Sequence, residues 1–346
     1  MKYWSWLKNM DKKNSIFEFK SNSPALLIAE IGMNHNGDVG LGMEMIKSAA
    51  DSGADVVKFQ TFNTSKFLSK GFPDYGTRKK HELSKKDHEK LLNYAVDCGI
   101  DFLSTPFDHE SVDMLVDIGV CAFKIASADL TNTPLLNKVI ETRKPIILST
   151  GYSTTSEVFK AYELLHGKSN SLCIMHCVAS YPTEDADVNL LNIVSIKNMF
   201  RNAIVGFSDH SLDSDLIPPV AVSLGAKVIE KHFTLDRSME GYDHHMSLTP
   251  DMFSKMKNNI RRVEACMGSS RSESGLIASE NERKIKAGRS LYWSKNLKKG
   301  EQVQESDFIL MRPGGGVSVD FIDKLCGLKL QRDVVEGELV EFVHLV

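Results

Sequence analysis

Residues 26–61, LLIAEIGMNHNGDVGLGMEMIKSAADSGADVVKFQT, decide the fold of this chain. The stretch opens on a short apolar run, continues with apolar residues at helical spacing, and closes on a second apolar run. Short continuous apolar runs are typical of buried parallel strands, and an amphipathic segment between two of them is typical of the connecting helix. The stretch therefore predicts one strand–helix–strand unit of a parallel sheet.

The same alternation continues as far as residue 265. Apolar runs predict eight strands, at residues 26–32, 54–61, 101–106, 122–127, 145–150, 171–177, 203–209 and 227–234. Helical spacing is found at residues 41–52, 87–98, 109–118, 154–165, 190–200, 213–224 and 250–265. A count of eight favours a closed barrel over an open doubly wound sheet, and no GxGxxG motif follows the first run. We predict an α/β fold, a (β/α)8 TIM barrel.

The pattern changes after the predicted barrel. Residues 268–287 are polar and predict a linker, whereas residues 288–346 contain short β-type segments separated by glycine turns. We therefore predict an N-terminal extension at 1–22, a catalytic barrel at 23–267, the linker, and a small, mostly β C-terminal domain at 288–346.

Composition excludes several classes of partner. The 346 residues carry 42 basic and 45 acidic side chains, so no basic field is available to hold nucleic acid or an anionic membrane. The six cysteines form no CxxC pair, which indicates reduced thiols. No apolar run has the length of a signal sequence or a membrane span. These features predict a cytoplasmic protein.

Polar residues occupy the carboxyl ends of the predicted strands or follow them directly. They are Glu30, Lys58, Gln60, Thr105, Ser127, Ser208 and His232. In a (β/α)8 barrel the carboxyl ends of all strands meet at one mouth, where active sites are built. The sequence therefore predicts an active site at this mouth.

Two histidines close neighbouring predicted strands, His210 in FSDHSLD and His232 in EKHFT. Imidazole suits Mn²⁺, Zn²⁺ or Fe²⁺, and two histidines leave positions open for water and substrate. The alternative is that each histidine makes an ordinary structural hydrogen bond. The adjacent pair His244 and His245 is predicted to lie at the surface.

A second group of residues is suited to binding anions. It contains Lys58, Thr105, Lys124, Ser127 and Ser208. The two lysines interrupt apolar strands, where an unpaired ammonium is costly. Converging with hydroxyl groups, they could hold a phosphate and a carboxylate by charge-assisted hydrogen bonds. The alternative interpretation is a salt bridge inside the barrel, such as Lys58 with Glu30. The two interpretations are compatible, because the salt bridge can form while no substrate is bound.

Carboxylates form a third group of candidates. They are Glu30, Asp129, Asp209, Glu230 and Asp243. A carboxylate that closes the first strand, as Glu30 does, can orient a water molecule or a substrate hydroxyl. Most barrel carboxylates, however, are structural partners of nearby lysines or arginines.

Taken together, residues 24–346 resemble the sialic acid (N-acetylneuraminate) synthase family, a barrel followed by an antifreeze-like (SAF) domain. Nine stretches carry the resemblance, in family order and spacing: AEIGMNHNGD, GADVVKFQT, FLSTPFD, FKIASAD, ILSTGYST, HCVASYPT, VGFSDHS, VIEKHFTLDR and MRPGG. Two positions depart from the family pattern. Many members have Asn in place of Ala179, and others have Pro in place of Tyr242. Both departures concern the sugar or phosphate region, so they leave the identity of the sugar open.

The resemblance implies a role for each candidate. It implies that His210 and His232 bind a divalent metal, Mn²⁺ or Mg²⁺, and act with Glu30 at the reacting carbons. Phosphoenolpyruvate would be held by Lys58, Thr105, Lys124, Ser127 and Ser208. The pocket for the sugar would be lined by Gln60, Asp129, Tyr181 and Asp243. Arg312 would reach the N-acyl group from the partner subunit of a domain-swapped homodimer.

The implied activity is condensation of phosphoenolpyruvate with an N-acyl amino-sugar aldehyde, with C–O cleavage and phosphate release. N-acetylmannosamine, giving N-acetylneuraminate, is the default acceptor. A 2,4-diacetamido-trideoxy hexose, giving a legionaminate- or pseudaminate-type acid, is the alternative. A 3-deoxy sugar-phosphate acid synthase is a second alternative, although it would not need residues 288–346. A non-catalytic ice- or carbohydrate-binding protein is a third, although the charged tail lacks the flat, uncharged face that ice binding needs.

Overall fold

A computed structural model describes residues 16–17, 23–268 and 275–346. Most of the predicted N-terminal extension and part of the linker lie outside these residues. The chain divides into two compact units, Met1–Met267 and Gly268–Val346.

The described residues of the first unit form eight strands, in the order β3-β2-β1-β8-β7-β6-β5-β4. Their bounds are β1 Leu26–Gly32, β2 Val56–Thr61, β3 Asp101–Pro106, β4 Phe123–Ile125, β5 Ile146–Ser149, β6 Leu172–Cys177, β7 Ile204–Asp209 and β8 Val228–His232. All seven hydrogen-bonded strand pairs are parallel, and β3 contacts β4 at the remaining seam. The predicted (β/α)8 barrel is thereby confirmed.

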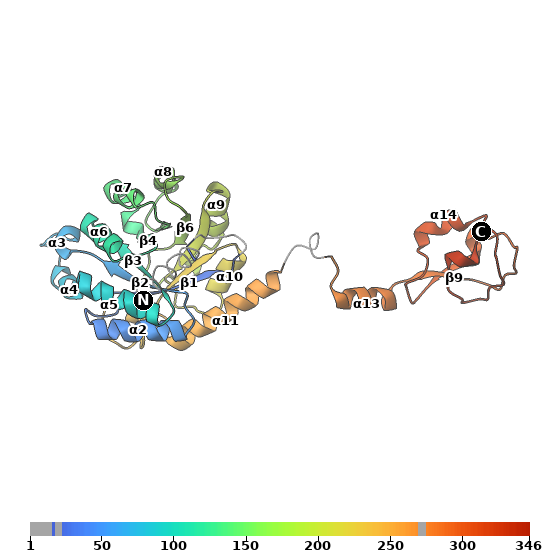
Figure 1. Cartoon of the computed structure of the whole chain (residues 1–346), viewed down its shortest axis with the longest axis horizontal. Coiled ribbons are helices and arrows are strands. Elements are labelled where there is room, and N and C mark those ends of the chain that lie inside the picture. The colour runs from blue at the N-terminus through green and yellow to red at the C-terminus, as the bar shows by residue number, and fades with distance from the viewer. Residues whose placement is uncertain (1–15, 18–22, 269–274) are drawn as a thin grey trace, which may run out of the picture. The chain divides into compact units, whose positions relative to one another are not determined.

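Helices surround these strands (Figure 1). They are α2 Val39–Asp51, α5 Lys85–Asp97, α6 His109–Asp117, α7 Thr133–Glu141, α8 Thr155–Leu165, α9 Leu191–Met199, α10 Ile217–Ser223 and α11 Pro250–Met267. Several begin where the sequence carries a capping residue. The Ser84 side chain accepts a hydrogen bond from the backbone of Asp87 and Thr154 does the same for Glu157, which satisfies amides that the helix leaves free.

The structure differs from the prediction around two strands. Two short helices, α3 Thr64–Phe67 and α4 Tyr75–His81, lie between β2 and α5, in a region where no element was predicted. Strand β4 ends two residues earlier than predicted, since Ser127–Asp129 forms a 3-10 helix. Segments this short carry too few apolar residues to show a period, so only the tertiary contacts reveal them.

Side-chain alternation along the strands determines which residues point into the barrel at its carboxyl end. On β1, Leu26 and Ile28 point into the barrel, and the next residue on that face is Glu30. On β8, Val228 is followed in the same way by Glu230 and His232. The barrel interior is therefore apolar at the amino ends of the strands and polar at the carboxyl ends. The opposite face of each strand packs against the helices in the main core.

The second unit is small and mostly β, as predicted. Strands β9 Ser290–Trp293 and β10 Phe308–Met311 pair antiparallel. Isolated bridges such as Leu297 with Val334 extend this arrangement, around a core that includes Trp293 and Leu330. The helices of this unit are α13 Ala278–Ala287 and α14 Ile322–Leu325. Among the described residues, no helix is both long enough and apolar enough to cross a membrane.

Candidate active site

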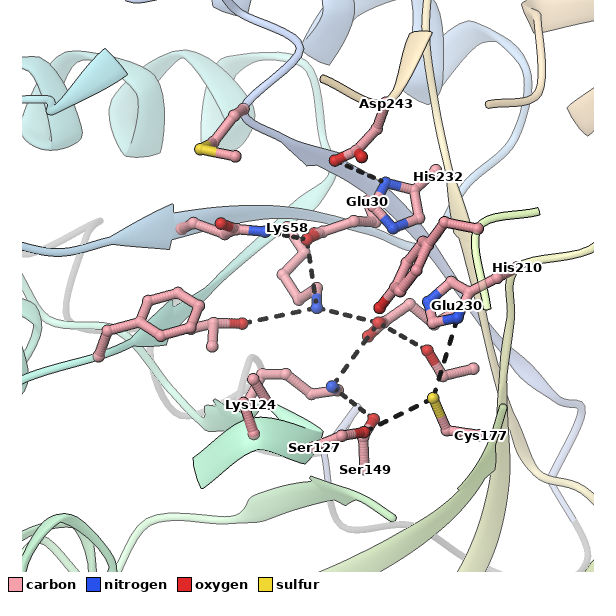
Figure 2. A pocket seen from close by; sticks show the side chains of 18 of the residues that line it. Glu30, Lys58, Lys124, Ser127, Ser149, Cys177, His210, Glu230, His232 and Asp243 are labelled. Carbon is pink, nitrogen blue, oxygen red and sulfur yellow. Dashed lines mark hydrogen bonds and ion pairs between the residues drawn. The ribbon is translucent and has the colours of Figure 1, made fainter. Parts of the chain in front are cut away.

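A cavity of about 350 Å³ opens at the carboxyl ends of the barrel strands (Figure 2). Twelve of the candidates named from the sequence line it: Glu30, Lys58, Gln60, Thr105, Lys124, Ser127, Tyr181, Ser208, His210, Glu230, His232 and Asp243. They come from seven of the eight strands or from the loops that follow them. The structure thus brings residues distant in sequence to one mouth.

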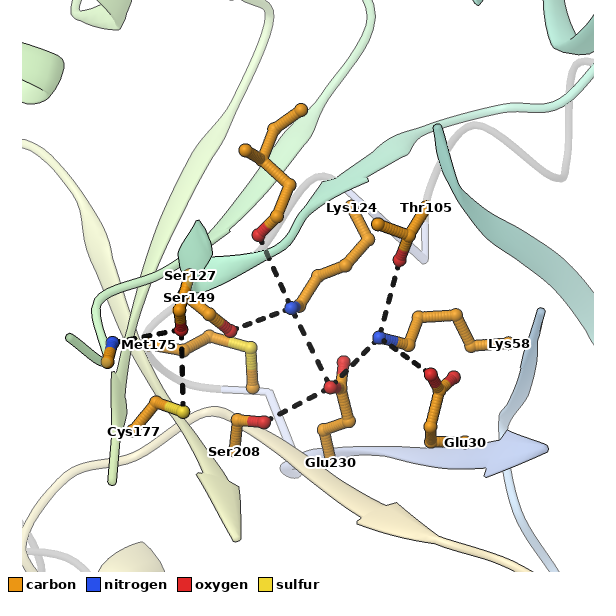
Figure 3. A network of polar contacts seen from close by, with 12 residues as sticks. Glu30, Lys58, Thr105, Lys124, Ser127, Ser149, Met175, Cys177, Ser208 and Glu230 are labelled. Atoms are coloured by element: carbon orange, nitrogen blue, oxygen red, sulfur yellow. Dashed lines mark hydrogen bonds and ion pairs between the residues drawn. The ribbon is translucent and has the colours of Figure 1, made fainter. Parts of the chain in front are cut away.

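A charge network occupies the floor of the cavity (Figure 3). The Lys58 Nζ lies 2.9 Å from Glu230 Oε1 and 3.5 Å from Glu30 Oε1. It also lies 3.5 Å from the Thr105 hydroxyl. The side chain of Gln60 donates a hydrogen bond to Glu30 at 3.3 Å. The salt bridge predicted as an alternative between Lys58 and Glu30 is therefore present, but the shorter contact of Lys58 is with Glu230.

Lys124 extends this network toward β5 and β7. Its ammonium donates a hydrogen bond to Ser149 Oγ at 2.7 Å and lies 3.6 Å from Glu230 Oε1. Ser208 donates to the same Glu230 oxygen at 3.1 Å. Ser127 accepts a hydrogen bond from the backbone amide of Gly151 at 2.9 Å. Two ammonium groups and several hydroxyls thus converge on one small volume, which is the arrangement that a doubly anionic ligand requires.

The two carboxylates of the network differ in their electrostatic environment. Burial raises the pKa of Glu30 to about 7, with a further rise from Glu230 and an opposing effect of Lys58. Burial also disfavours the charge of Glu230, but Lys124 and Lys58 outweigh it and lower the pKa of this carboxyl. Glu230 is therefore the ionised partner of the lysines, and Glu30 can exchange a proton near neutral pH.

The two predicted metal-binding histidines lie side by side, with ring centroids 5.5 Å apart. Burial lowers the pKa of His210 to about 4 and of His232 to about 3, so both rings are neutral. The His210 Nδ1 bonds the carbonyl oxygen of Val178 at 2.7 Å, which leaves Nε2 for a ligand. The His232 Nδ1 is buried without a hydrogen-bond partner and lies 3.6 Å from Asp243.

These rings fit a divalent metal in their chemistry, since neutral imidazoles and an orphaned ring nitrogen are what a metal ion needs. No group of three or more His, Cys, Asp and Glu side chains is placed to hold a metal within residues 16–17, 23–268 and 275–346. A metal bound by His210 and His232 would therefore take its remaining ligands from water and substrate.

Asp129 does not line the cavity, and the predicted contact of Arg312 with the cavity of a partner subunit stays a prediction. Asp129 is partly buried on the short helix after β4 and bonds Asn132, and it is not among the residues that line the cavity. Arg312 is exposed and follows β10 in the second unit. The prediction of a surface position for both His244 and His245 is wrong for His244, which is fully buried and bonds Thr234 at 2.7 Å.

The cavity also contains residues to which the sequence assigned no role. They are Met33, Phe67, Arg78, Phe107, Ala126, Ala128, Ser149, Tyr152, Cys177 and Tyr242. Glu230 was named only as a candidate carboxylate; it stands two residues before His232 on β8, so strand alternation was a signal that both side chains point inward. No such signal was available for Arg78, which lies on the unpredicted helix α4.

The barrel, the converging lysines and the neutral histidine pair form a cavity that is chemically suited to an anionic ligand. Comparison with known proteins then defines the class of protein. The NeuB family model matches residues 45–272 and the SAF domain model matches residues 288–346. The chain belongs to the NeuB family, which confirms the resemblance found in the nine stretches, and it is an enzyme of the nonulosonic acid synthase class.

Three similar proteins cover most of the chain. The N,N'-diacetyllegionaminic acid synthase of Legionella pneumophila is 37% identical over 96% of this chain and 98% of its own length. The pseudaminic acid synthase of Campylobacter jejuni is 36% identical over 94% of this chain and 98% of its own. The solved N-acetylneuraminic acid synthetase of Leptospira borgpetersenii is 36% identical, with a TM-score of 0.72 over 76% of this chain and 90% of its own.

Proposed function

We propose that this enzyme condenses phosphoenolpyruvate with a 2,4-diacetamido-trideoxy hexose to give a legionaminate- or pseudaminate-type acid. The main support for this reaction is that Lys58 and Lys124 converge on one cavity, which also holds two neutral histidines. The choice of acceptor follows two relatives named for such acids, which match nearly the whole chain. These relatives favour the diacetamido sugar over the default, N-acetylmannosamine.

Phosphoenolpyruvate fits the half of the cavity formed by β2 to β7. Lys58, Lys124 and the hydroxyls of Thr105, Ser127 and Ser208 can offset the charges of its carboxylate and phosphate. Gln60, Tyr181 and Asp243 line the same cavity and would contact the sugar. Holding both reactants together removes several kcal/mol of entropic cost at the usual scale of such effects.

The proposed reaction forms one carbon–carbon bond and one carbon–oxygen bond from water, and it breaks the carbon–oxygen bond to phosphate while the aldehyde oxygen takes up a proton. The enol carbon attacks the aldehyde carbon, water adds to the resulting oxocarbenium-like carbon, and phosphate leaves with its bridging oxygen. Glu30, with a pKa near 7, is suited to accept the proton of the attacking water. A Mn²⁺ or Mg²⁺ ion bound by His210 and His232 would supply Lewis-acid polarisation of the aldehyde. A swapped dimer in which Arg312 reaches the partner's cavity stays a prediction.

The test is phosphate release from phosphoenolpyruvate by metal-stripped protein after Mn²⁺ is added back. Three acceptors are compared: a 2,4-diacetamido-2,4,6-trideoxy hexose, N-acetylmannosamine and arabinose 5-phosphate. We expect metal-dependent release with the diacetamido sugar. Replacement of the cavity residue, His210→Ala, should lower the rate at least about 1,000-fold, or ~4 kcal/mol. The matched variant His109→Ala alters an exposed histidine on α6 and should leave the rate unchanged.

Each acceptor separates one alternative from the others. Release only with N-acetylmannosamine would restore the default sugar and overturn the proposed acceptor. Release only with arabinose 5-phosphate would indicate the 3-deoxy sugar-phosphate acid synthase. Equal rates with and without metal would overturn the role of the histidine pair. The non-catalytic binding protein is not supported, since the chain belongs to a family of synthases.

A further inference from the structure

A guanidinium group forms part of the wall of the cavity on the side of Asp243. The Arg78 side chain stacks over the ring of Tyr242, with its Cζ 4.4 Å from the ring centroid. Its Nε donates a hydrogen bond to Asp74 Oδ2 at 2.9 Å, and the Tyr242 hydroxyl donates to the other oxygen of Asp74. Arg78 and Tyr242 line the cavity, whereas Asp74 does not. We call these three residues the Arg78 wall.

The Arg78 wall joins two segments distant in sequence. Arg78 lies on α4, and Tyr242 immediately precedes Asp243 in the loop after β8. The Tyr242 ring also packs edge-on against His81, at 5.3 Å between centroids. A Cβ atom on Gly37, in the turn after β1, would lie 2.2 Å from the Lys80 carbonyl oxygen, so this turn approaches α4 closely. The Arg78 guanidinium is held by the Tyr242 ring and the Asp74 carboxylate, and the contacts of Tyr242 and of the turn after β1 hold these segments together.

Arg78 keeps hydrogen-bonding capacity that the protein does not use. A guanidinium carries five N–H donors, and Asp74 takes the one on Nε. Within the described part of the chain, the other contact of its donors is Nη1 with the Met33 sulfur at 3.2 Å, a weak acceptor. Arg78 is one-quarter exposed and lies at the cavity. A ligand oxygen in the cavity would be a better partner than either the sulfur or competing water.

The charge and the neighbours of Arg78 restrict that ligand. Asp74 offsets the positive charge, and hydrogen bonds from Tyr242 and Arg78 overcome its desolvation to lower the pKa of this carboxyl. A wall without net charge favours an uncharged oxygen over a phosphate. Apolar side chains line the cavity with it, including Met33, Phe67 and Phe107, and the two phenylalanine rings lie 4.7 Å apart. A carbonyl oxygen next to a methyl group, as in an acetamido substituent, matches both features.

We propose that Arg78, held by Asp74 and Tyr242, is a specificity-determining residue that binds the carbonyl oxygen of a second acylamino group on the acceptor. This inference rests on the proposed function, because it assigns a partner to the substituent that distinguishes a diacetamido sugar from N-acetylmannosamine. Tyr242 acts through Arg78 as a positioning residue.

The test separates binding from catalysis. Each acceptor is reduced to its alditol, which has no aldehyde and cannot react. The affinity of the alditols for the full-length protein, saturated with phosphoenolpyruvate and Mn²⁺, is measured by calorimetry. The set contains the diacetamido alditol, N-acetylmannosaminitol and its 6-phosphate. Phosphate release with the unreduced sugars is recorded in parallel for the same variants.

We expect Arg78→Met to weaken binding of the diacetamido alditol by roughly 10- to 100-fold, the usual cost of losing a hydrogen bond from a charged donor. Binding of N-acetylmannosaminitol should change less than about 3-fold, and the KM for phosphoenolpyruvate should not change. Tyr242→Phe keeps the ring under the guanidinium but releases Asp74, so a smaller loss with the same selectivity is expected. Arg237→Met is the matched control. Arg237 lies in the loop after β8 that also contains Tyr242, donates to the His245 carbonyl oxygen and does not line the cavity.

Several results would overturn the inference. One is equal loss of both uncharged alditols in Arg78→Met, which would mean that the wall only supports the fold. Others are no loss of either alditol, or preferential binding of the 6-phosphate. The proposed function can fail separately. Selective binding of the diacetamido alditol, without phosphate release from phosphoenolpyruvate in the presence of any of the sugars, would support the Arg78 wall and overturn the proposed reaction.

Discussion

The two faces of strands β7 and β8 carry charged residues of the same types for different purposes. On the outer face Lys231 donates to Asp209 at 2.9 Å, and both side chains are 1% exposed. Ser211 completes this pair, since its carbonyl oxygen accepts from Lys231 at 2.6 Å and its amide donates to Asp209 at 2.8 Å. On the inner face, one residue away, Glu230 and His232 each retain a buried atom without a hydrogen-bond partner.

This difference separates residues that hold the barrel together from residues that wait for a ligand. A buried polar atom without a partner costs free energy, and the fold retains it only where something else compensates. The outer pair is satisfied by the protein alone. The inner atoms, together with Glu30 Oε2, would be satisfied by substrates, metal and water. The outer face should therefore determine stability, and the inner face should determine activity.

Breaking the outer pair should have the largest effect on stability. Lys231→Met leaves the Asp209 carboxylate buried without its cation, and we expect the free energy of unfolding to fall by about 3–5 kcal/mol. The measurement is urea denaturation followed by circular dichroism. The double variant Asp209→Asn/Lys231→Met removes both charges and should recover most of the loss. A loss below about 1 kcal/mol in Lys231→Met would contradict the structural role of the outer face.

Neutralising an inner carboxyl should have an opposite effect on stability, and one that depends on pH. The pKa of Glu30 is raised from 4.5 to about 7, so between these values the unfolded chain loses a proton that the folded chain keeps. Stability from this group is complete below pH 4.5 and is lost as pH rises to 7. Relative to the parent chain, Glu30→Gln should therefore gain up to about 3 kcal/mol of stability across this window.

Denaturation of both proteins at several pH values measures that gain. Phosphate release by Glu30→Gln should fall at the same time, because the amide cannot accept a proton. A constant difference in stability between pH 4.5 and pH 7 would show that Glu30 does not bind a proton in this range. Glu30 would then no longer be an example of an inner residue that lowers the stability of the fold while serving catalysis.

The sequence predicts the inner face better than it predicts the pairing within it. Continuous apolar runs locate the strands, and parallel strands bring their ends together, so His210 and Lys124 could be placed at the mouth. Glu30 and Lys58 are register partners on neighbouring strands, which is why their salt bridge could be anticipated. The closer contact of Lys58 with Glu230 depends on side-chain geometry across the barrel, which periodicity does not contain.

The least predictable part of the site comes from the segments between strands. Arg78 lies on a seven-residue helix within a stretch that has no clear period, and its partner Tyr242 comes from a loop 164 positions further along the chain. Only the packed structure joins them. Asp129 is the opposite case, since the family resemblance implied a place in the sugar pocket, but Asp129 lies on the 3-10 helix after β4 and does not line the cavity.

The smallest effects that we predict come from replacing two serines, one on the inner face and one on the outer face, that each contact a buried lysine. Ser149 accepts a hydrogen bond from Lys124 at 2.7 Å on the inner face, and the Ser211 hydroxyl contacts Lys231 at 3.3 Å on the outer face. Ser149→Ala removes one hydrogen bond, and Ser211→Ala removes the contact with Lys231 together with one from the Asp213 amide at 3.3 Å. A hydrogen bond of this kind is worth about 1 kcal/mol. For Ser149→Ala this should appear mainly as a roughly 5-fold higher KM for phosphoenolpyruvate, because Lys124 loses the group that orients it toward the substrate. For Ser211→Ala it should appear in the free energy of unfolding, with KM unchanged. If both variants lost stability and kept KM, the inner network would be as structural as the outer pair, and the division between the faces would have to be abandoned.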